Sequence, residues 1–327
     1  NLTEETIYVL DSPILTNSQI KKFKKLFVKK IKTIDCTFNT EESLKDNLAR
    51  IQAEAEISVR EGSSTIILSD KNLSEKRANM PMILSVGAVN SHLVKLGLRG
   101  YCSINVETAE TLDTHSFAVL IGVGATTINP YLVLDSIYQR YEKKLFGKID
   151  FNTCIARYKK SVENGLLKIM SKMGISVISA YRGGCNFETV GLSRALVSDY
   201  FPGMVSRISG IGIIGIENKI KSLHKKAYQK DVLILPIGGI YKYRKSGENH
   251  QFEGRLIHTL QHAVGTGSYE TYKKYSQGIH NLPPMNLRDL LDFKSGRSSV
   301  NLNEVETIEE LTKRFGSGSM SHGALSK

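Results

Sequence analysis

Several residue types are scarce or absent in this sequence. It has no tryptophan, seven prolines and four cysteines in 327 residues. The cysteines lie far apart, and neither a CxxC pair nor a histidine at ligand spacing accompanies them. This argues against a disulfide framework, a zinc ribbon and an iron–sulfur motif. Cys36, Cys102, Cys154 and Cys185 are instead predicted to be small buried side chains in a reducing compartment.

Long hydrophobic runs are also missing. No apolar stretch reaches the roughly 20 residues that a membrane-spanning helix needs, and no signal-peptide pattern opens the chain. We therefore expect a cytoplasmic protein without a membrane partner. The chain begins on Asn1 rather than methionine, and we expect it to be a segment of a longer polypeptide.

Positive charge exceeds negative charge, with a formal net charge of +12 and a pI near 9.4. Such a balance invites a nucleic-acid interpretation. The lysines are dispersed in small clusters, however, and most stand at helical spacing beside apolar residues, as on solvated helix faces. No RNP-like aromatic signature, zinc-finger spacing or basic-region heptad accompanies them. We therefore expect no nucleic-acid partner.

The first half of the chain alternates between strand-like and helix-like segments. Strands are predicted at residues 64–69, 101–106 and 127–129, and helices at 81–96 and 114–121. Further helices are predicted from the capping residue Ser43 to Arg60 and over residues 132–144. Such alternation with short connections is typical of a parallel sheet with helices on both faces, either barrel-like or doubly wound. The predicted fold class is therefore α/β.

The second half is less regular. A helix is predicted over residues 152–173, a strand over 175–180, and a strand or helix start at 187–190. Residues 203–215 are rich in glycine, serine and isoleucine and show no clear period. Short amphipathic helices are expected at 286–293 and 307–315, and the connector 294–303 between them is the predicted boundary of the main body.

Catalytic signatures are missing from the whole chain. No Ser-His-Asp, HExxH or paired-carboxylate pattern is present. His92 is interpreted as a packing or hydrogen-bonding residue, and His115 as a packing residue or a helix-capping group. Gly122 and Gly124 lack the third glycine of a dinucleotide loop. Residues 181–184, with one arginine and two glycines, fit either an anion site or a tight turn.

The last thirteen residues, 315–327, are mostly small. Glycine and serine let backbone amides approach a phosphate or a flavin ring without an intervening side chain. The pattern is typical of the first strand and turn of a flavin-binding barrel. A barrel would need roughly 200 further residues to close.

Several long motifs together resemble one family, the large (alpha) subunit of glutamate synthase. The resemblance runs in family order along almost the whole chain. It is carried by residues 10–17, 67–70, 97–99, 115–122, 124–125 with 129–132, 164–174, 181–183 with 187–188 and 190–192, 209–212, 258–263 and 314–327.

This resemblance implies a function for the intact protein. In the family, an N-terminal glutaminase domain releases ammonia, which crosses a central domain through a tunnel. The ammonia then meets 2-oxoglutarate over FMN in a (β/α)8 barrel that also holds a 3Fe-4S cluster. The reductant is ferredoxin or a small NAD(P)H-oxidising subunit. In the family the glutaminase and FMN domains belong to the same polypeptide and are partners of the central domain.

For this chain the resemblance implies a central domain over residues 1–294. Residues 295–327 would be the linker and first strand of the FMN domain. Gly318, Ser319, Met320 and Ser321 are expected to contact FMN in the intact enzyme, and no catalytic or metal-binding residue is expected here. The segment alone is expected to be inactive and to bind neither FMN nor a cluster. The alternative is a non-catalytic α/β scaffold or binding domain.

Two residues are expected to line the ammonia tunnel. Thr16 and Asn17 follow the apolar end of the motif at residues 10–17, and small polar groups can hydrogen-bond ammonia in transit without trapping it. The same two residues also suit helix capping. Both interpretations stay open from the sequence.

Overall fold

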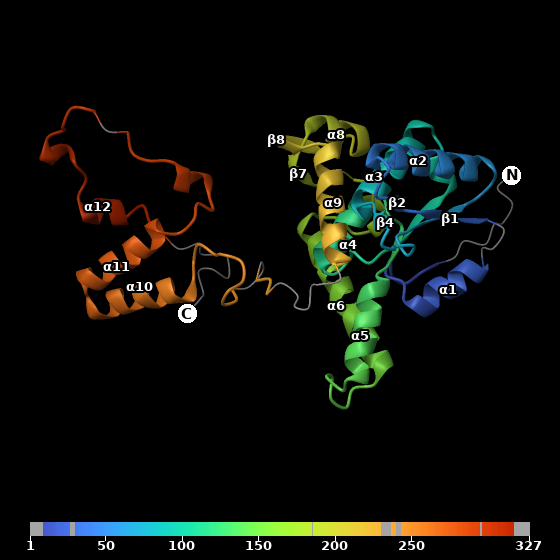
Figure 1. Cartoon of the computed structure of the whole chain (residues 1–327), viewed down its shortest axis with the longest axis horizontal. Helices are drawn as coiled ribbons and strands as arrows, with labels where there is room; N and C mark the ends of the chain where they lie inside the picture. The colour runs from blue at the N-terminus through green and yellow to red at the C-terminus, as the bar shows by residue number, and fades with distance from the viewer. Residues whose placement is uncertain are drawn as a thin grey trace. The chain divides into compact units, whose positions relative to one another are not determined.

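The computed structural model describes residues 9–26, 30–184, 186–229, 237–239, 243–294 and 296–316. The chain divides into two units, Asn1–Asp231 and Val232–Lys327, and each is described by itself. Most of the buried residues lie in the first unit, shown from blue to yellow in Figure 1.

A four-stranded parallel sheet forms the centre of the first unit. Its strands, in spatial order, are β1 (Ile31–Asp35), β3 (Thr65–Ser69), β5 (Ser103–Glu107) and β6 (Thr127–Asn129). Beyond β6, Ile14 makes a single parallel bridge to Ile128. The predicted parallel sheet is thus confirmed, with strands that follow one another in chain order. In the described part of the chain the sheet is open.

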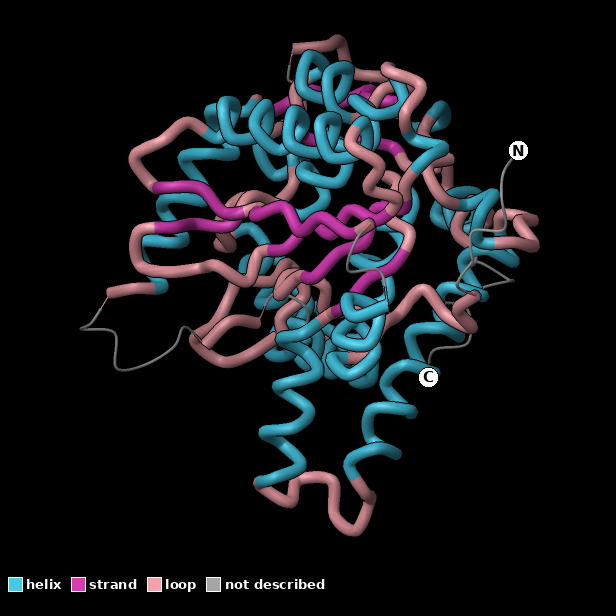
Figure 2. Tube along the Cα trace, turned by 90° about the vertical axis from the view of Figure 1, so that its right-hand side faces the viewer, coloured by secondary structure: helices cyan, strands magenta, loops and turns pink. Residues whose placement is uncertain are grey.

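Helices cover both faces of this sheet. The crossovers are α2 (Leu44–Arg60), α3 (Met82–Lys95) and α4 (Thr114–Gly122), and they pack on the main hydrophobic core. Because right-handed crossovers between strands added in one direction leave the same side of the sheet, these three helices share a face. Helix α1 (Asn17–Leu26) covers the other face, where Ile20 and Phe23 pack with Ile67. Figure 2 shows the magenta strands side by side between helices.

The two faces of the sheet differ in polarity. Ile34, Leu68, Val106 and Ile128 are partners in register, and they belong to the core under α2, α3 and α4. Side chains alternate between faces along a strand, so the next residues point toward α1. On that side several buried residues are polar. They are Thr65, Ser69, Asn105, Glu107, Thr127 and Asn129.

Local signals explain where several helices begin. The Ser43 side chain accepts a hydrogen bond from the Asp46 amide and caps α2, as predicted. At α4 the expectation for His115 as a cap was wrong. Asp113 accepts from the Ser116 amide instead, because it stands at the position before the first helical residue. His92 Nε2 donates a hydrogen bond to the Glu56 carboxylate at 2.9 Å, which agrees with the interpretation of His92 as a hydrogen-bonding residue.

Two glycines that resembled a phosphate loop serve packing. A side chain at Gly122 would collide with the ring of Phe187, and one at Gly124 would collide with Asn90. Gly124 also has φ +127°, a conformation that glycine adopts without strain. Both glycines are therefore explained by packing rather than by a dinucleotide loop, as the sequence predicted.

A long helical hairpin follows the sheet. It consists of α5 (Tyr131–Glu142) and α6 (Phe151–Lys172), which project from the sheet in both views (Figures 1 and 2). Tyr138 packs edge-on against Phe151 near the turn. No helix in the described ranges is both long and apolar enough to cross a membrane.

The chain after α6 differs from the prediction. Residues 175–180 were expected to form a strand, but the structure has the short helix α7 (Ile178–Tyr181). The Ile175 amide donates back to the Met170 carbonyl, and the Tyr181 side chain is buried, so the chain turns into the core. Of the two alternatives at 187–190, a strand or a helix start, the structure has the strand, β7 (Glu188–Leu192). The stretch 203–215 holds β8 (Val205–Ile211) and the start of α9 (Ile213–Ala227), neither of which the sequence pattern predicted.

Smaller elements complete the first unit. They are β2 (Thr37–Asn39) and β4 (Arg77–Asn79), which pair antiparallel, η1 (Arg99–Tyr101) and α8 (Arg194–Tyr200). Helix α9 packs back on the core through Ile213, Ile216 and Ile220. The Glu217 carboxylate accepts from the Leu44 amide at the start of α2.

The second unit is helical in its described part. Its elements are α10 (Gly254–Thr266), α11 (Tyr269–His280), η2 (Leu287–Leu290), η3 (Leu302–Glu304) and α12 (Ile308–Thr312). The helix expected at 286–293 is only the 3-10 turn η2, where Asp289 reaches back to the Asn286 backbone. The helix expected at 307–315 is α12, capped by Thr307.

Candidate functional site

A row of polar residues crosses the sheet where its strands end. Asp35 is in register with Ser69, Ser69 with Glu107, and Glu107 with Asn129. We call these four residues the carboxyl-edge row. In open α/β sheets, ligands bind outside the carboxyl ends of the strands. The row is therefore the first place to look for a functional site.

Glu107 is the charged centre of the row. Its side chain is buried, yet Lys24 Nζ donates to Oε2 at 2.6 Å and Lys71 Nζ to Oε1 at 2.8 Å. Burial raises the pKa of Glu107, but the hydrogen bonds and charges of the two lysines outweigh it, so the pKa lies below its usual value. Glu107 is thus held as a carboxylate between two cations and is not poised as a general base.

Asp70 lies one residue beyond the row and is fully buried. It accepts from the Thr108 hydroxyl at 2.6 Å, the Tyr131 hydroxyl at 2.7 Å and the Ala109 amide. Burial raises the pKa of Asp70 above its usual value, although these hydrogen bonds act in the opposite direction. Burial and Asp70 itself raise the pKa of Tyr131. This cluster holds the strand ends together through hydrogen bonds.

Asn17 lies against the far end of the row. Its Oδ1 accepts from Asn129 Nδ2 at 3.0 Å, and its Nδ2 donates to Asp135 Oδ1 at 3.0 Å. Asn129 Nδ2 also donates to the Leu15 carbonyl, while no described residue hydrogen-bonds to its buried Oδ1. The structure therefore connects one of the two predicted tunnel residues directly to the carboxyl-edge row.

Thr16 has a clear local role. Its Oγ1 accepts from the Gln19 amide at 3.2 Å, and Gln19 Oε1 accepts from the Thr16 amide at 2.9 Å. This reciprocal pair is a capping box at the start of α1. Thr16 and Asn17 are both half-buried. The capping interpretation therefore has direct geometric support for Thr16, and the tunnel role of both residues stays a prediction.

Gly318, Ser319, Met320 and Ser321 fall outside the described residues. In the segment 181–184 the Gly183 amide donates to the Ile121 carbonyl, as in a turn against α4. Cys36 and Cys102 are buried, and burial raises the pKa of the Cys36 thiol to about 12. Within the described ranges, no group of three or more His, Cys, Asp or Glu side chains is arranged to hold a metal ion.

Sequence reasoning missed the residues that form the row. Asp35, Ser69, Glu107 and Asn129 each end a strand, and that position was the available signal. Their polar character did not identify them, because polar residues also end strands in ordinary turns. Lys24 gave no signal, since it stands on α1 among other lysines.

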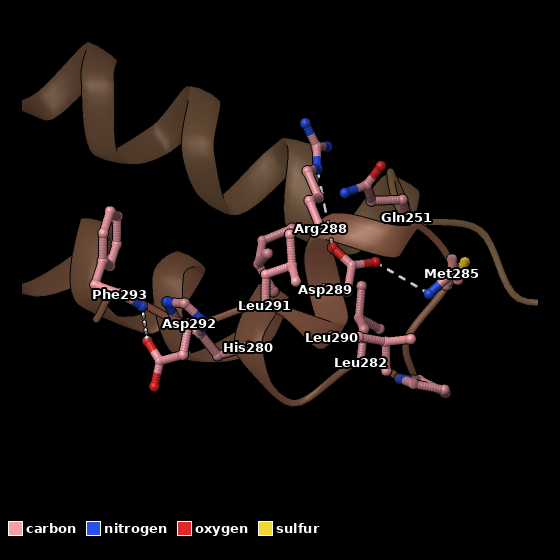
Figure 3. A pocket seen from close by; sticks show the side chains of 12 residues that line it. Gln251, His280, Leu282, Met285, Arg288, Asp289, Leu290, Leu291, Asp292 and Phe293 are labelled. Atoms are coloured by element: carbon pink, nitrogen blue, oxygen red, sulfur yellow. Dashed lines mark hydrogen bonds and ion pairs between the residues drawn. The ribbon is translucent and has the colours of Figure 1, made fainter. Parts of the chain in front are cut away.

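The second unit has a groove of its own. It encloses about 800 Å³ and is drawn in Figure 3. Asp289 accepts from the Met285 and Asn286 amides and lies 3.9 Å from Arg288 Nε, so its charge holds the local turn. The rest of the lining is mainly apolar, with Leu290, Leu291 and Phe293 largely exposed. The groove therefore offers apolar surface rather than a set of reacting groups.

The carboxyl-edge row is better suited to contacting a small bound molecule than to making or breaking covalent bonds. Its charged groups are paired, and its carboxylates are engaged by lysines or hydroxyls. What remains is a set of small hydrogen-bonding side chains that ends at Asn129 and Asn17. Such groups interact with a small polar molecule without holding it as a counter-ion would.

Comparison with known proteins gives a consistent result. A family model described as "Glutamate synthase central domain" matches residues 2–193, and one described as "Conserved region in glutamate synthase" matches residues 250–327. The chain is 50% identical to the glutamate synthase [NADPH] large chain of Azospirillum brasilense, over 99% of this chain and 22% of that protein.

Two further relatives extend the comparison. Identity is 38% to the glutamate synthase [NADPH] large chain of Bacillus subtilis, over 97% of this chain and 21% of the relative. Identity to the ferredoxin-dependent glutamate synthase of Pyropia yezoensis is 36%, over 97% of this chain and 22% of that protein. The chain thus spans about a fifth of the length of these curated relatives. With its family model covering residues 2–193, the chain belongs to the glutamate synthase central-domain family.

Proposed function

We propose that this chain is the part of a glutamate synthase large chain that connects the ammonia-releasing site to the glutamate-forming site. The observation that carries the proposal is the match of residues 2–193 to the central-domain family, together with 50% identity to a large chain across nearly all its residues. In this proposal the intact protein is an oxidoreductase that converts glutamine and 2-oxoglutarate to glutamate. These residues contribute no catalytic group of their own.

The proposal assigns cofactors and partners to the intact protein. FMN and a 3Fe-4S cluster belong to the synthase part, with Gly318, Ser319, Met320 and Ser321 contacting FMN. Residues 1–294 form the central domain, and residues 295–327 lead into the flavin domain. The reductant is ferredoxin or a small NAD(P)H-oxidising subunit. The relatives include proteins named for NADPH and proteins named for ferredoxin, which supports keeping both.

Within this function, Thr16 and Asn17 line part of the ammonia path. Ammonia must cross shielded from bulk water, because protonation to ammonium removes the lone pair that makes it a nucleophile. The half-buried Asn17 side chain, hydrogen-bonded to Asn129 at the end of the carboxyl-edge row, is a suitable neutral contact. The support is geometric. The small polar side chains of Asn17 and Asn129 meet there, and the Asp135 carboxylate accepts a hydrogen bond from Asn17.

The test uses the full-length enzyme with Asn17→Leu and, separately, Thr16→Leu. A narrowed path leaves glutamine hydrolysis intact, lowers glutamine-dependent glutamate formation, and releases free ammonia to solvent. Asn152→Leu is a matched control, because Asn152 is an exposed asparagine in the first turn of α6. Unchanged coupling of the two half-reactions at unchanged stability would remove Thr16 and Asn17 from the path.

The capping role of Thr16 needs its own control. Thr16→Ser keeps the hydroxyl that accepts from the Gln19 amide and removes only a methyl group. If Thr16→Leu acts only by weakening α1, its melting temperature falls and coupling stays normal in the enzyme that remains folded. If it acts on the path, coupling falls while Thr16→Ser behaves like the wild type.

A further inference from the structure

Asn129, the last residue of β6, has a side-chain oxygen to which no described residue donates a hydrogen bond. Asn129 is 0% exposed, and its Oδ1 is buried with it. The two other buried asparagines of the described residues differ in this respect. Asn47 Oδ1 accepts from Arg50 Nε at 3.1 Å, and Asn105 Oδ1 accepts from Thr127 Oγ1 at 2.6 Å. Because buried polar atoms are paired as a rule, we expect a donor for Asn129 Oδ1 as well.

The neighbours of Asn129 fix which end of its amide group carries the oxygen. Its Nδ2 lies 2.9 Å from the Leu15 carbonyl oxygen, which can only accept a hydrogen bond. Nδ2 also donates to Asn17 Oδ1 at 3.0 Å, and Asn17 Nδ2 in turn donates to the Asp135 carboxylate at 3.0 Å. Since each end of this relay is an acceptor, each amide group has one orientation. The other end of the Asn129 amide is therefore a carbonyl oxygen, which accepts hydrogen bonds and cannot donate them.

The neighbouring charge does not compete for this oxygen. Glu107 is in register with Asn129, so the two side chains lie on the same face of the sheet. Burial raises the pKa of Glu107, but Lys24 and Lys71 bring it below its usual value, so Glu107 has no proton to give to a bound base. Asn129 thus offers a neutral acceptor beside a charge that is already paired. A neutral acceptor holds an uncharged N–H donor more weakly than a carboxylate holds a cation, and so releases what it binds more readily.

We propose that Asn129 Oδ1 is a binding position for one ammonia molecule on its route past Asn17. This inference rests on the proposed function, in which ammonia crosses the domain at Asn17, and it adds a residue of β6 to those that contact it. One N–H of ammonia donates to Oδ1, while the nitrogen lone pair stays unprotonated. The side chain of Asn17 already has a partner for each of its polar atoms and holds Asn129 in place.

The first test looks for a bound donor directly. Crystals of the full-length enzyme are soaked in hydroxylamine at mildly alkaline pH, where it is an uncharged nitrogen donor whose second heavy atom distinguishes it from water. We expect elongated electron density with its nearer atom about 2.9 Å from Asn129 Oδ1. Absence of density there, or a spherical peak that the soak does not change (an ordered water only), would overturn the proposal. Because this measurement needs no substitution, it decides the proposal even where a variant fails to fold.

The second test measures coupling in full-length Asn129→Leu, in which a side chain of the same branching has no polar atom. We expect the ratio of glutamate formed to free ammonia released to fall about 5-fold, the factor that one neutral hydrogen bond gives. Asn105→Leu is the matched control. Asn105 is buried on the same face and also donates through Nδ2, to the Ile66 carbonyl and Ser103 Oγ, but its Oδ1 is bonded within the sheet. An equal fall in both variants would reduce Asn129 to a structural residue and refute the proposal.

A double-mutant cycle separates direct contact from an effect through Asn17. Asn17→Ala removes the relay without filling the space, and Asn129→Leu is then added to it. Direct contact requires a further fall in coupling of about 5-fold, whereas no further fall means that Asn129 acts only by holding Asn17, which contradicts the proposal. If Asn17→Leu loses coupling and Asn129→Leu keeps it, this inference fails while the proposed function stands. An intact enzyme that forms no glutamate from glutamine refutes the proposed function itself.

Discussion

Replacing Gly87 with alanine tests how tightly α3 packs against the end of α8. Gly87 lies inside α3, where alanine is favoured over glycine by about 1 kcal/mol from helix propensity alone. A Cβ at this position would lie 2.7 Å from Phe201 Cδ1, nearer still to Phe201 Cε1, and 2.9 Å from the Tyr200 carbonyl oxygen. Because the Phe201 side chain is buried and the Tyr200 contact is a backbone carbonyl, neither group can move aside without a cost in free energy.

The two effects have opposite signs, and the clash is expected to win. Overpacking of a filled core costs about 1–3 kcal/mol, and the collision with a ring and a carbonyl places this site toward the upper end. After the propensity gain, Gly87→Ala loses about 1–2 kcal/mol of unfolding free energy. For a unit of this size, that lowers the melting temperature by about 2–8 °C.

The assay is thermal unfolding of the 327-residue chain followed by circular dichroism at the helix band. Val94→Ala is the control, because Val94 is exposed on the same helix and its change is expected to be nearly neutral. If the melting temperature of Gly87→Ala equals or exceeds that of the wild type, the gain from helix propensity is at least as large as the cost of overpacking. The close packing of α3 against Tyr200 and Phe201 would then be refuted.

Three further predictions follow from the same structure. Glu107 has a folded pKa below its unfolded value, so its stabilisation is present above about pH 4.3 and is lost as the pH falls through the folded pKa. Glu107→Gln should therefore cost roughly 1–2 kcal/mol at pH 7, with the lysines partly screened by solvent, and in denaturant titrations its difference from the wild type should shrink as the pH falls below the unfolded pKa and vanish only below the folded one. The purified 327-residue chain is expected to carry no stoichiometric FMN, since affinity needs a site that buries most of the ligand; a flavin absorption spectrum after gel filtration would contradict this. The same chain is expected to release no ammonia from glutamine, because the resemblance places that nucleophile in another domain, and a coupled ammonia assay checks it.

Much of the first unit was predictable because its signals are local. The β-branched run at 64–69 became β3, and the helix capped by Ser43 became α2. Glycine after α3 and α6 ended those helices near the predicted positions. Each of these features depends on neighbours within a few residues, so one sequence is enough to read them.

The errors arose where long-range packing decided the structure. Residues 175–180 have strand-like composition, yet the burial of Tyr181 and the return of Ile175 onto α6 made a turn and a short helix. At 203–215 the sequence pattern did not predict strand β8. The irregular pairing of β8 with β7 breaks the period of two on which strand prediction depends.

The sequence by itself determined the parallel α/β sheet, the helix caps and the family, because residue spacing and long motifs are enough to predict them. Only the tertiary structure decided that Asp35, Ser69, Glu107 and Asn129 form one row, that Lys24 pairs with Glu107 from 83 residues away, and that Asn17 meets Asn129. The physical reason is that strand register and crossover direction bring distant segments together. A side chain's partner across such a distance is set by packing of the whole sheet, not by its own neighbours in the chain.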